Sequence, residues 1–230
     1  MAVTQITGSG SDVGRSRGRP AANAGSVPDE DELLAAAFAV FAERGYDSTS
    51  IRDLSGRLGI SHNLLNVRFG KKEDLWKAAV DWRFAGAGKS VEKVFASDAD
   101  PEQRLRDLIH AFGEWAISNG DIVCISHLEV RNNDWRIDYI HERFAGPFQV
   151  RLELLLDEVR QHRPVATLTG GSLLVMLIYG MGMYFAAPEL RERLEGTAAF
   201  GMARQRQRAR EFADFVLGGL LPQMPESQPV

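Results

Sequence analysis

The chain has 230 residues, of which 44% are hydrophobic and 25% are charged, and its formal net charge is −4 at pH 7. This is ordinary globular composition, and the length suits one large domain or two small ones. The single cysteine, Cys124, excludes a framework of internal disulfides and fits a reducing compartment. The net charge does not decide whether nucleic acid is a partner, because the distribution of charge matters more.

The N-terminal segment, residues 1–25, is rich in Gly, Ser, Ala and Arg and poor in large apolar side chains. We expect it to be disordered when free, because it cannot bury enough apolar surface to fold. The first 28 residues contain no apolar run of the kind found in secretory signals, so no such signal is expected. Within it, "GRSRGRP" carries Arg15, Arg17 and Arg19.

The first predicted helix spans about residues 28–44, within "SVPDEDELLAAAFAVFAERGY". Ser26 is the expected N-cap, with Asp29 three residues on in the pattern of a capping box. The acidic residues that follow suit the positive end of the helix dipole, and Gly45 is the expected stop. The apolar stripe at helical spacing consists of Leu34, Ala37, Phe38 and Phe41.

Two short helices follow, in "STSIRDLSGRLGIS" and "SHNLLNVRFG". Ser50 and Asp53 form a second capping-box pattern, Gly59 ends the first of the two helices, and Ser61 caps the second. Two helices of about two turns, joined by "LGIS", have the spacing of a helix–turn–helix. From Ser50 to Lys72 the charged residues sum to +4, so positive charge gathers here and on the preceding arginine segment.

The rest of the chain is predicted to be helical up to about residue 220. Further helices are expected in "KKEDLWKAAVDWRF", "PEQRLRDLIHAFGEWAIS", "DIVCISHLEVRN" and "DWRIDYIHERFAGPFQVRLELLLDEVRQH", the last interrupted before Pro147. A final helix is expected over 197–219. No alternating strand pattern and no repeat is visible, so the predicted fold is all-α. The expected division is an arm (1–25), a helix–turn–helix domain (26–72), a helical domain (73–221) and a tail (222–230).

One stretch, Val165–Ala187, contains no charged residue and is long enough to cross a bilayer. The alternative is a helix buried inside the protein or at a subunit interface. Gly, Ser and Thr dilute the stretch, and no clear basic cluster flanks it, which favours the buried helix. We expect this helix and the last one to pack against their symmetry mates as a four-helix bundle, with Leu177 and Phe215 in the interface.

Residues 30–78 resemble the N-terminal domain of the TetR family of transcriptional regulators. "FAERGYDSTSIRDLSGRLGIS" follows the family's pattern through the first three helices, and "FGKKEDL" follows its segment at the start of the fourth. The resemblance implies a DNA-binding N-terminal domain, followed by a divergent helical part that binds a small ligand and forms the dimer. The chain departs from the pattern at Ser55, where alanine is usual, at Asn66, where a phosphate-binding tyrosine is usual, and at Arg68.

The resemblance places a recognition helix at residues 61–69, whose first residues enter the major groove. Asn63 can pair with adenine, His62 can meet a base edge, and Leu64 can lie against a thymine methyl group. Ser61 stands with these three at the start of the recognition helix. The remaining candidates are a base or phosphate contact from Arg52 and phosphate contacts from Ser50, Asn66, Arg68 and Lys72. The alternative for each residue is a solvated polar side chain on a surface helix.

The arginine segment has the character of a minor-groove arm, because narrow A·T-rich grooves attract arginine. "RGRP" is also similar to the core of an AT-hook. The alternative is a solubilising tail whose arginines have no partner. If the segment is an arm, we expect Arg15, Arg17 and Arg19 to add affinity while the helices supply most of the sequence choice.

Enzymatic signals are weak: we find no Gly-rich phosphate loop, no metal-ligand spacing and no nucleophile elbow. A metal site from His127, Glu129 and His141 is conceivable only if folding brings them together. No cofactor is expected. The helical part is rich in side chains that could build an apolar cavity, and the candidates for ligand contact are Phe112, Trp115, Trp135, Tyr139, Phe148, Met176, Tyr179 and Met183.

The leading hypothesis is a cytoplasmic homodimeric repressor that binds palindromic double-stranded DNA and is released by a small apolar or amphipathic effector. A second hypothesis is a TetR-like architectural protein that coats many DNA sites and needs no ligand. A third is a helical protein anchored in a membrane by Val165–Ala187.

Overall fold

The computed structural model describes residues 28–132, 134–195 and 201–222, and all regular structure within these ranges is helical, as expected. In chain order, the first helices are α1 (Glu30–Arg44), α2 (Ile51–Leu58), α3 (His62–Phe69), α4 (Lys72–Ala87), α5 (Lys89–Phe95), α6 (Pro101–Ser118), α7 (Gly120–Asn132), α8 (Trp135–Ile140), η1 (His141–Ala145) and α9 (Gly146–Arg160). They are followed by α10 (Gly170–Met176), η2 (Leu177–Gly182), α11 (Met183–Ala186), α12 (Pro188–Glu195) and α13 (Met202–Leu220).

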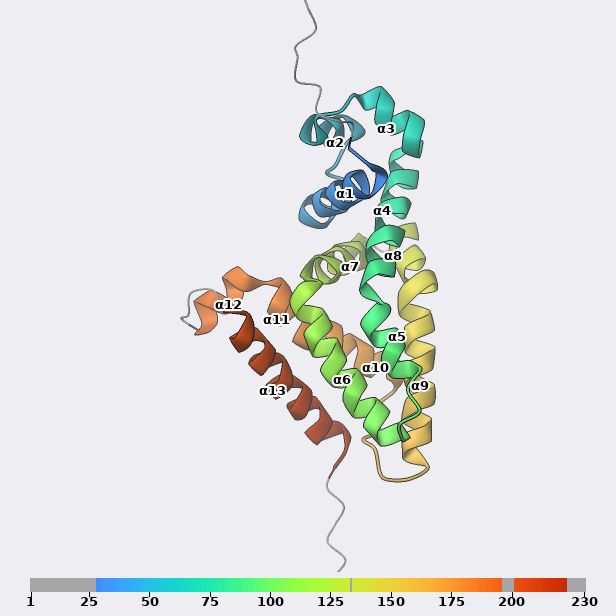
Figure 1. The fold of residues 1–230 in the computed structure, drawn as a ribbon, viewed down its shortest axis with the longest axis vertical. Helices are drawn as coiled ribbons and strands as arrows, with labels where there is room; N and C mark the ends of the chain where they lie inside the picture. Colours follow the sequence, from blue (N-terminus) through green and yellow to red (C-terminus); the bar gives the residue numbers. More distant parts are fainter. Residues whose placement is uncertain (1–27, 133, 196–200, 223–230) are drawn as a thin grey trace, which may run out of the picture.

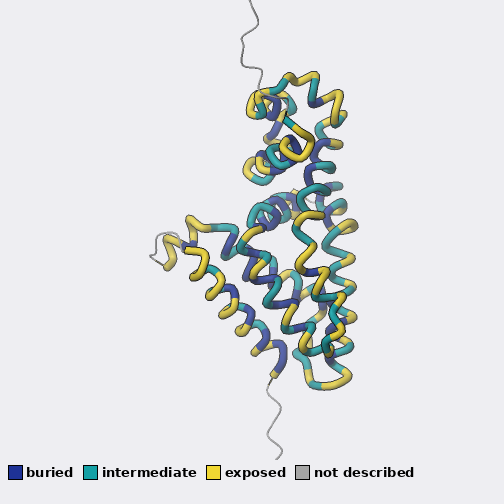
Figure 2. The backbone as a smooth tube through the Cα atoms, in the orientation of Figure 1, coloured by how far each residue is buried: buried dark blue, intermediate teal, exposed yellow. Residues whose placement is uncertain are grey.

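Helices α1–α3 form the upper end of the molecule in Figure 1, and α4 leads from them into the remaining helices. α4 packs along α1. The last described helix, α13, packs along α6. α9 lies on the other side of the molecule from α13 (Figure 1). The burial pattern in Figure 2 follows this arrangement, with dark buried turns facing inward along most helices.

The cap of α1 differs from the expected one. Asp29, not Ser26, is the N-cap: its Oδ1 accepts from the Glu32 backbone N–H at 2.8 Å, and Glu32 Oε2 accepts from the Asp29 N–H at 3.1 Å. Both acceptors of this capping box are carboxylates beside the positive end of the helix, which favours it over a box built on a hydroxyl. Ser26 lies outside the described residues.

The helix–turn–helix has the expected caps. The Ser50 hydroxyl accepts from the Asp53 N–H at 3.1 Å, Ser61 caps α3 through the Leu64 N–H, and Gly59 ends α2 with a left-handed φ of 65°. Ser55, where the family usually has alanine, is buried but donates its hydroxyl to the Arg52 carbonyl at 2.9 Å. The buried hydroxyl therefore has a hydrogen-bond partner, which lowers the cost of burying it.

Within the described residues, two helical stretches contain π-helical segments. The predicted break before Pro147 is η1, where the Gly146 N–H donates to the His141 carbonyl five residues back. The uncharged stretch begins its helix at Gly170 and passes through η2 to Ala186. Among the described helices, none alone is long and apolar enough to cross a membrane, and Gly170–Ala186 meets that test only together with Pro188–Glu195, at a bend of 82°.

The apolar core has two clusters. The upper cluster joins α1–α4 to α7 and α8 and contains Phe38, Leu54, Leu65, Trp76 and Ile125, so it extends across the boundary expected at residue 72. The lower cluster joins α5, α6, α9, α10, η2, α11 and α13. Leu177 is fully buried in the lower cluster, so it is not available for the interface expected of it, whereas the Phe215 side chain is 81% exposed.

Candidate nucleic-acid interface and ligand cavity

The exposed face of α3 is formed by His62, Asn63, Asn66 and Val67, while Leu65 faces the upper cluster. His62 and Asn66 are four residues apart, and so are Asn63 and Val67, so each pair lies on the same face of the helix. The Asn66 side-chain amide lies 3.3 Å from His62 Nε2, so the two polar side chains orient each other. An exposed helix face of this kind can present side chains to a base edge.

Val67 is a candidate that sequence reasoning missed. It is 75% exposed, one turn after Asn63, on the same face of α3. Leu64, the expected contact for a thymine methyl group, is half-buried. Val67 therefore presents more free apolar surface on this face than Leu64, and its spacing from Asn63 is the signal that points to it.

The candidates on α2 are at the surface. Arg52 is exposed, and Ser50 is exposed with its hydroxyl also hydrogen-bonded to Asp53 Oδ2 at 2.6 Å. That bond lowers the pKa of Asp53 below its ordinary value, because it stabilises the carboxylate. The Ser50 hydroxyl thus serves the cap of α2 in this structure.

Arg68 and Lys72 each have partners within the chain. Arg68 donates from Nη1 to the carbonyl of Pro28 at 3.0 Å, which ties the start of the described chain to the end of α3. Lys72 is half-buried, with Nζ 4.0 Å from the ring centroid of Tyr46. Burial lowers the pKa of Lys72. A phosphate would have to draw either cation away from its present contact or share it.

The arginine segment that contains Arg15, Arg17 and Arg19 lies outside the described residues. Pro28 is the nearest described point of the chain to it, and the Arg68 hydrogen bond places Pro28 beside α3. The described part of the chain therefore begins next to the candidate recognition helix.

A buried arginine connects the upper helices to the rest of the chain. Arg136 on α8 donates from Nη1 and Nη2 to the two carboxylate oxygens of Asp47, at 3.1 and 2.9 Å, and Asp47 lies in the loop between α1 and α2. Arg136 Nε lies 2.6 Å from Oε2 of Glu129 on α7, and Nη2 lies 2.7 Å from Asp134. The Glu129 side chain is fully buried and that of Arg136 is 2% exposed. Burial raises the pKa of Glu129, whereas the Arg136 hydrogen bonds lower that of Asp47.

Two of the expected ligand contacts, Trp135 and Tyr139, belong to this connection instead of a cavity. Trp135 packs edge-on against Trp76 and Tyr46, with centroids 5.2 and 5.6 Å apart. Tyr139 donates its hydroxyl to Asp81 at 2.9 Å, and burial together with this bond raises its pKa to about 12. The two rings stand on α8 on the side that meets α4, so they do not line the cavity described next.

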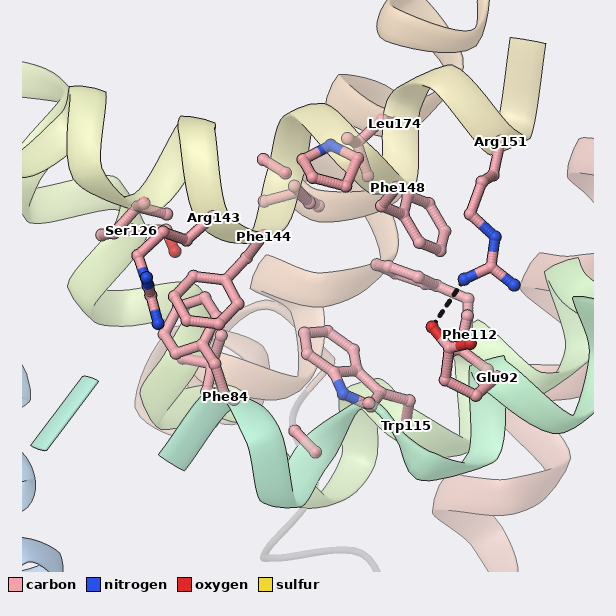
Figure 3. Close-up of a pocket in the computed structure, with 18 residues that line it drawn as sticks. Phe84, Glu92, Phe112, Trp115, Ser126, Arg143, Phe144, Phe148, Arg151 and Leu174 are labelled. Atoms are coloured by element: carbon pink, nitrogen blue, oxygen red, sulfur yellow. Dashed lines mark hydrogen bonds and ion pairs between the residues drawn. The ribbon is translucent and has the colours of Figure 1, made fainter. Parts of the chain in front are cut away.

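An apolar cavity of about 280 Å³ lies among α4–α9, α10 and η2 (Figure 3). Of the expected ligand contacts, it is lined by Phe112, Trp115 and Phe148. The other residues that line it are Phe84, Ala87, Gly88, Val91, Glu92, Ile122, Ser126, Ile140, Arg143, Phe144, Ala145, Pro147, Arg151, Leu174 and Ile178. Its size is near the lower end of the usual range for sites that bind small molecules.

Met176, Tyr179 and Met183 do not line this cavity, so their role as ligand contacts stays a prediction. Met176 is 52% exposed, and Tyr179 packs edge-on against His127 with centroids 5.7 Å apart. These residues share a helix with Leu174 and Ile178, but they stand on other faces of it. The position of a residue along the helix sets the face on which its side chain lies, and only one face of this helix borders the cavity.

Polar groups mark the ends of the cavity. Arg143 and Ser126 lie near Phe84 and Phe144 at one end, and Arg151 and Glu92 lie at the other, with the rings of Phe112, Trp115 and Phe148 between (Figure 3). An apolar middle with charged ends is suited to an amphipathic ligand.

The described residues contain no cluster of three or more His, Cys, Asp and Glu that could hold a metal ion. Glu129, a member of the conceivable metal set, is instead buried against Arg136. Cys124 is half-buried with its Sγ 3.8 Å from the Ala186 carbonyl, and burial raises the pKa of its thiol. A thiol with a raised pKa is less often in the reactive thiolate form.

Residues 33–79 match the family model of the bacterial regulatory proteins of the tetR family. Among curated relatives, the repressor KstR2 of Mycobacterium tuberculosis is 38% identical over 84 residues, 35% of this chain and 40% of the relative. The activator FasR of Mycolicibacterium smegmatis is 31% identical over 81 residues, 35% and 37% of the two chains. The repressor NicS of Pseudomonas putida is 27% identical over 95 residues, 41% and 45%. The matches thus span less than half the length of these relatives, each of which is named as a transcriptional regulator and not as an enzyme.

Solved structures resemble the chain over most of its length. KstR2 of Mycobacterium tuberculosis superposes with a TM-score of 0.63 at 23% identity, covering 86% of this chain and 98% of that one. AibR, solved in complex with isovaleryl coenzyme A and operator DNA, superposes with a TM-score of 0.64 at 17% identity, covering 84% and 97%. At these identities the likeness shows a shared fold, from the helix–turn–helix through the C-terminal helices.

Proposed function

We propose that the chain, whose residues 33–79 match the tetR family of bacterial regulatory proteins, is a cytoplasmic homodimeric repressor released from a palindromic operator by a small apolar or amphipathic effector. One observation carries the proposal. The helices that line the cavity, α7 and α8, also hold the buried Glu129–Arg136 pair that binds the loop before the helix–turn–helix.

The coupling follows from helical spacing. α7 lines the cavity through Ser126 and bears Glu129 about one turn further on, and α8 lines it through Ile140 and bears Arg136 about one turn earlier. A ligand that separates α7 from α8 at the cavity would therefore disturb the bonds from Arg136 to Asp47. The effector then favours an arrangement of the upper helices with lower operator affinity, and the two bindings are reciprocally coupled.

At the DNA end, α3 presents His62, Asn63 and Val67 to the major groove, with Ser61 and Leu64 at its N-terminal side. Arg52 and Ser50 on α2 are proposed to meet the backbone or a base, and Asn66, Arg68 and Lys72 to meet phosphate. Phosphate contacts fix register, and base contacts choose sequence. AibR, which shares the fold, was solved on operator DNA, which supports this use of the N-terminal helices.

The arginine segment is proposed to enter the minor groove beside each recognition helix. The hydrogen bond from Arg68 to the Pro28 carbonyl supports this, because it brings the start of the described chain next to α3. Arginine is drawn to narrow A·T-rich grooves by their enhanced negative potential.

The proposed dimer interface is built from α10, η2 and α13. It is supported by apolar side chains that are exposed in the single chain: Val175, Met176 and Phe215 are 56%, 52% and 81% exposed. A Cβ at Gly180 would meet nothing within 4 Å, so this glycine leaves room for a neighbouring helix. Exposed apolar side chains gathered on helices of this kind are common at subunit interfaces.

Two other glycines of α10 and η2, Gly171 and Gly182, lie close to side chains of the same chain. A Cβ on Gly182 would lie 3.1 Å from Val123 Cγ2, and one on Gly171 would lie 3.2 Å from Gln149 Nε2. Both glycines relieve packing within the subunit, against α7 and α9.

The proposal is tested by selecting the chain's binding sites from genomic DNA and then titrating a selected site with cell extract. We expect inverted-repeat sites, and extract fractions of small molecules that release the protein from them. Sites without symmetry that no fraction releases would instead indicate the ligand-independent, multi-site DNA-binding protein.

A further inference from the structure

The charged residues that line the cavity are Glu92, Arg143 and Arg151, and they lie at its ends and not along its middle. We propose that the cavity binds an amphipathic carboxylate whose apolar chain lies against Phe112, Trp115 and Phe148 and whose headgroup binds Arg151 in place of Glu92. This inference rests on the proposed function only in treating the cavity as the effector site.

Arg151 is better placed to receive a headgroup than Arg143. Arg143 donates from Nε and Nη2 to both oxygens of Asp81, at 2.9 and 3.0 Å, and Asp81 also accepts the Tyr139 hydroxyl. Arg151 donates only from Nη1, to Glu92 Oε1 at 2.6 Å, and within the described ranges its other donors have no acceptor. A carboxylate arriving at Arg151 can therefore use two parallel N–H donors, the geometry that arginine offers to carboxylates.

The Arg151 guanidinium has a second contact besides Glu92. Its Cζ lies 4.0 Å from the ring centroid of Phe95, so an aromatic face supports it from another side. Stacking of this kind holds a guanidinium while leaving its N–H edge free to bind.

The Arg151–Glu92 pair is open to water and easily exchanged. The Glu92 side chain is 65% exposed and that of Arg151 is 38% exposed, so the pair contributes little by itself. A ligand carboxylate would be held beside Arg151 by its own buried chain, which gives it a high effective concentration there. Glu92, when displaced, turns into solvent without leaving a buried charge.

Displacement of Glu92 by a ligand carboxylate acts on α5, which is connected through α4 to helices α1–α3. Glu92 stands on α5, which follows α4 with only Gly88 between them, and Arg151 stands on α9. Replacing Glu92 by a ligand carboxylate cuts the ion pair that ties α5 to α9. The exchange therefore acts at the lower end of the α4–α5 segment, while Arg143 and Tyr139 still hold α4 through Asp81.

The experiment compares octanoate with 1-octanol, which have the same chain length and differ in the charge of the headgroup. Their binding to the full-length protein is measured by calorimetry for the wild type and for Arg151→Gln, Glu92→Gln, Arg143→Gln and Arg106→Gln. Arg106 is the matched control, because it forms an ion pair with Glu102, is 39% exposed and does not line the cavity.

We expect the wild type and Arg106→Gln to bind octanoate about tenfold more tightly than octanol, the effect of one added charge-assisted bond. Arg151→Gln should abolish the preference, and Glu92→Gln should increase it by removing the competing carboxylate. Equal binding of the two probes by the wild type, or no binding of either, overturns the proposal. The proposal is also overturned if Arg143→Gln loses the preference for octanoate while Arg151→Gln retains that preference. Operator selection tests the regulator proposal separately, so either can fail without the other.

Discussion

Arg136 reaches from α8 to Asp47, 89 residues earlier in the chain, and holds both oxygens of its carboxylate at 3.1 and 2.9 Å. The arginine is buried and its partner is exposed, with side chains 2% and 71% exposed. An exposed carboxylate can thus be replaced with little effect on the core. Substituting Asp47 is therefore a practical way to break the connection between α8 and the α1–α2 loop.

Asp47→Asn should weaken this connection and leave the fold intact. We expect a loss of stability of about 1 kcal/mol, because the Asp47 carboxylate is exposed and the buried Arg136 keeps Glu129 and Asp134 as partners. Hydrogen exchange should become faster in the α1–α2 loop and α2, measured by mass spectrometry. Asp134→Asn is the control, since Asp134 also pairs with Arg136 but belongs to α8 itself and asparagine can still cap that helix. Equal exchange in the two variants would show that Asp47 does not order the loop.

The same pair predicts a pH dependence. Arg136 lowers the pKa of Asp47 below its ordinary 3.8, so the folded state favours the carboxylate. The resulting stabilisation is fully present above pH 3.8 and is lost as the pH falls through the lower folded pKa. The difference in Tm between wild type and Asp47→Asn should therefore be constant near neutral pH and close in strong acid. Glu129, whose pKa is raised by burial, acts in the opposite sense, but it is present in both proteins. A Tm difference that grows in acid would contradict the assignment.

The exposed face of α3 predicts which substitutions change sequence preference. Asn63→Ala and His62→Ala should each relax the preference at particular operator positions, at a cost of about 1–3 kcal/mol there. Their affinity for unrelated DNA should stay the same, which serves as the internal control, because neither change removes a lysine or an arginine from the surface. High-throughput selection with each variant would measure both quantities. An unchanged binding-site pattern in both variants would mean that α3 meets DNA in another register.

Phe215→Arg should give a soluble, folded monomer. Phe215 is 81% exposed in the single chain, so arginine is tolerated there until a second subunit would bury it unpaired. Val150→Arg is the control, since Val150 is 59% exposed on α9, across the molecule from α13 (Figure 1). Light scattering after size exclusion would give the masses. A dimeric Phe215→Arg protein that binds its operator normally would remove Phe215 from the interface.

Deleting residues 1–22 should weaken DNA binding and leave the described fold intact, because that segment has too few large apolar side chains to contribute to a core. The effect should be largest for operators with A·T-rich flanks. Six arginines per dimer could change the log–log salt slope by up to about five, at roughly 0.9 per contact, and a change of two or three is expected if contacts are partial. Equal slopes, and equal affinities on A·T-rich and G·C-rich flanks, would mean that the segment is a tail.

The sequence by itself determined the local elements of this protein. The caps at Ser50 and Ser61, the stop at Gly59 and the break before Pro147 are visible in the sequence, because each depends on atoms within five residues of one another. One predicted cap is wrong: Asp29, and not Ser26, caps α1. The carboxylates of Asp29 and Glu32 offered a competing box three residues away, and pattern alone did not rank the two.

Only the tertiary structure decided which side chains share a site. Trp115 and Trp135 look equally suited to a cavity in the sequence, yet one lines it and the other packs against Trp76 beside the helix–turn–helix. The partners of Arg136 could not be predicted, because a salt bridge depends on where distant helices cross and not on spacing along the chain. Leu177 and Phe215 are both large apolar residues, and only packing shows that the first is buried and the second exposed. Helical periodicity sets the faces of each helix, but the contacts between helices set which face meets the core, the cavity or the solvent.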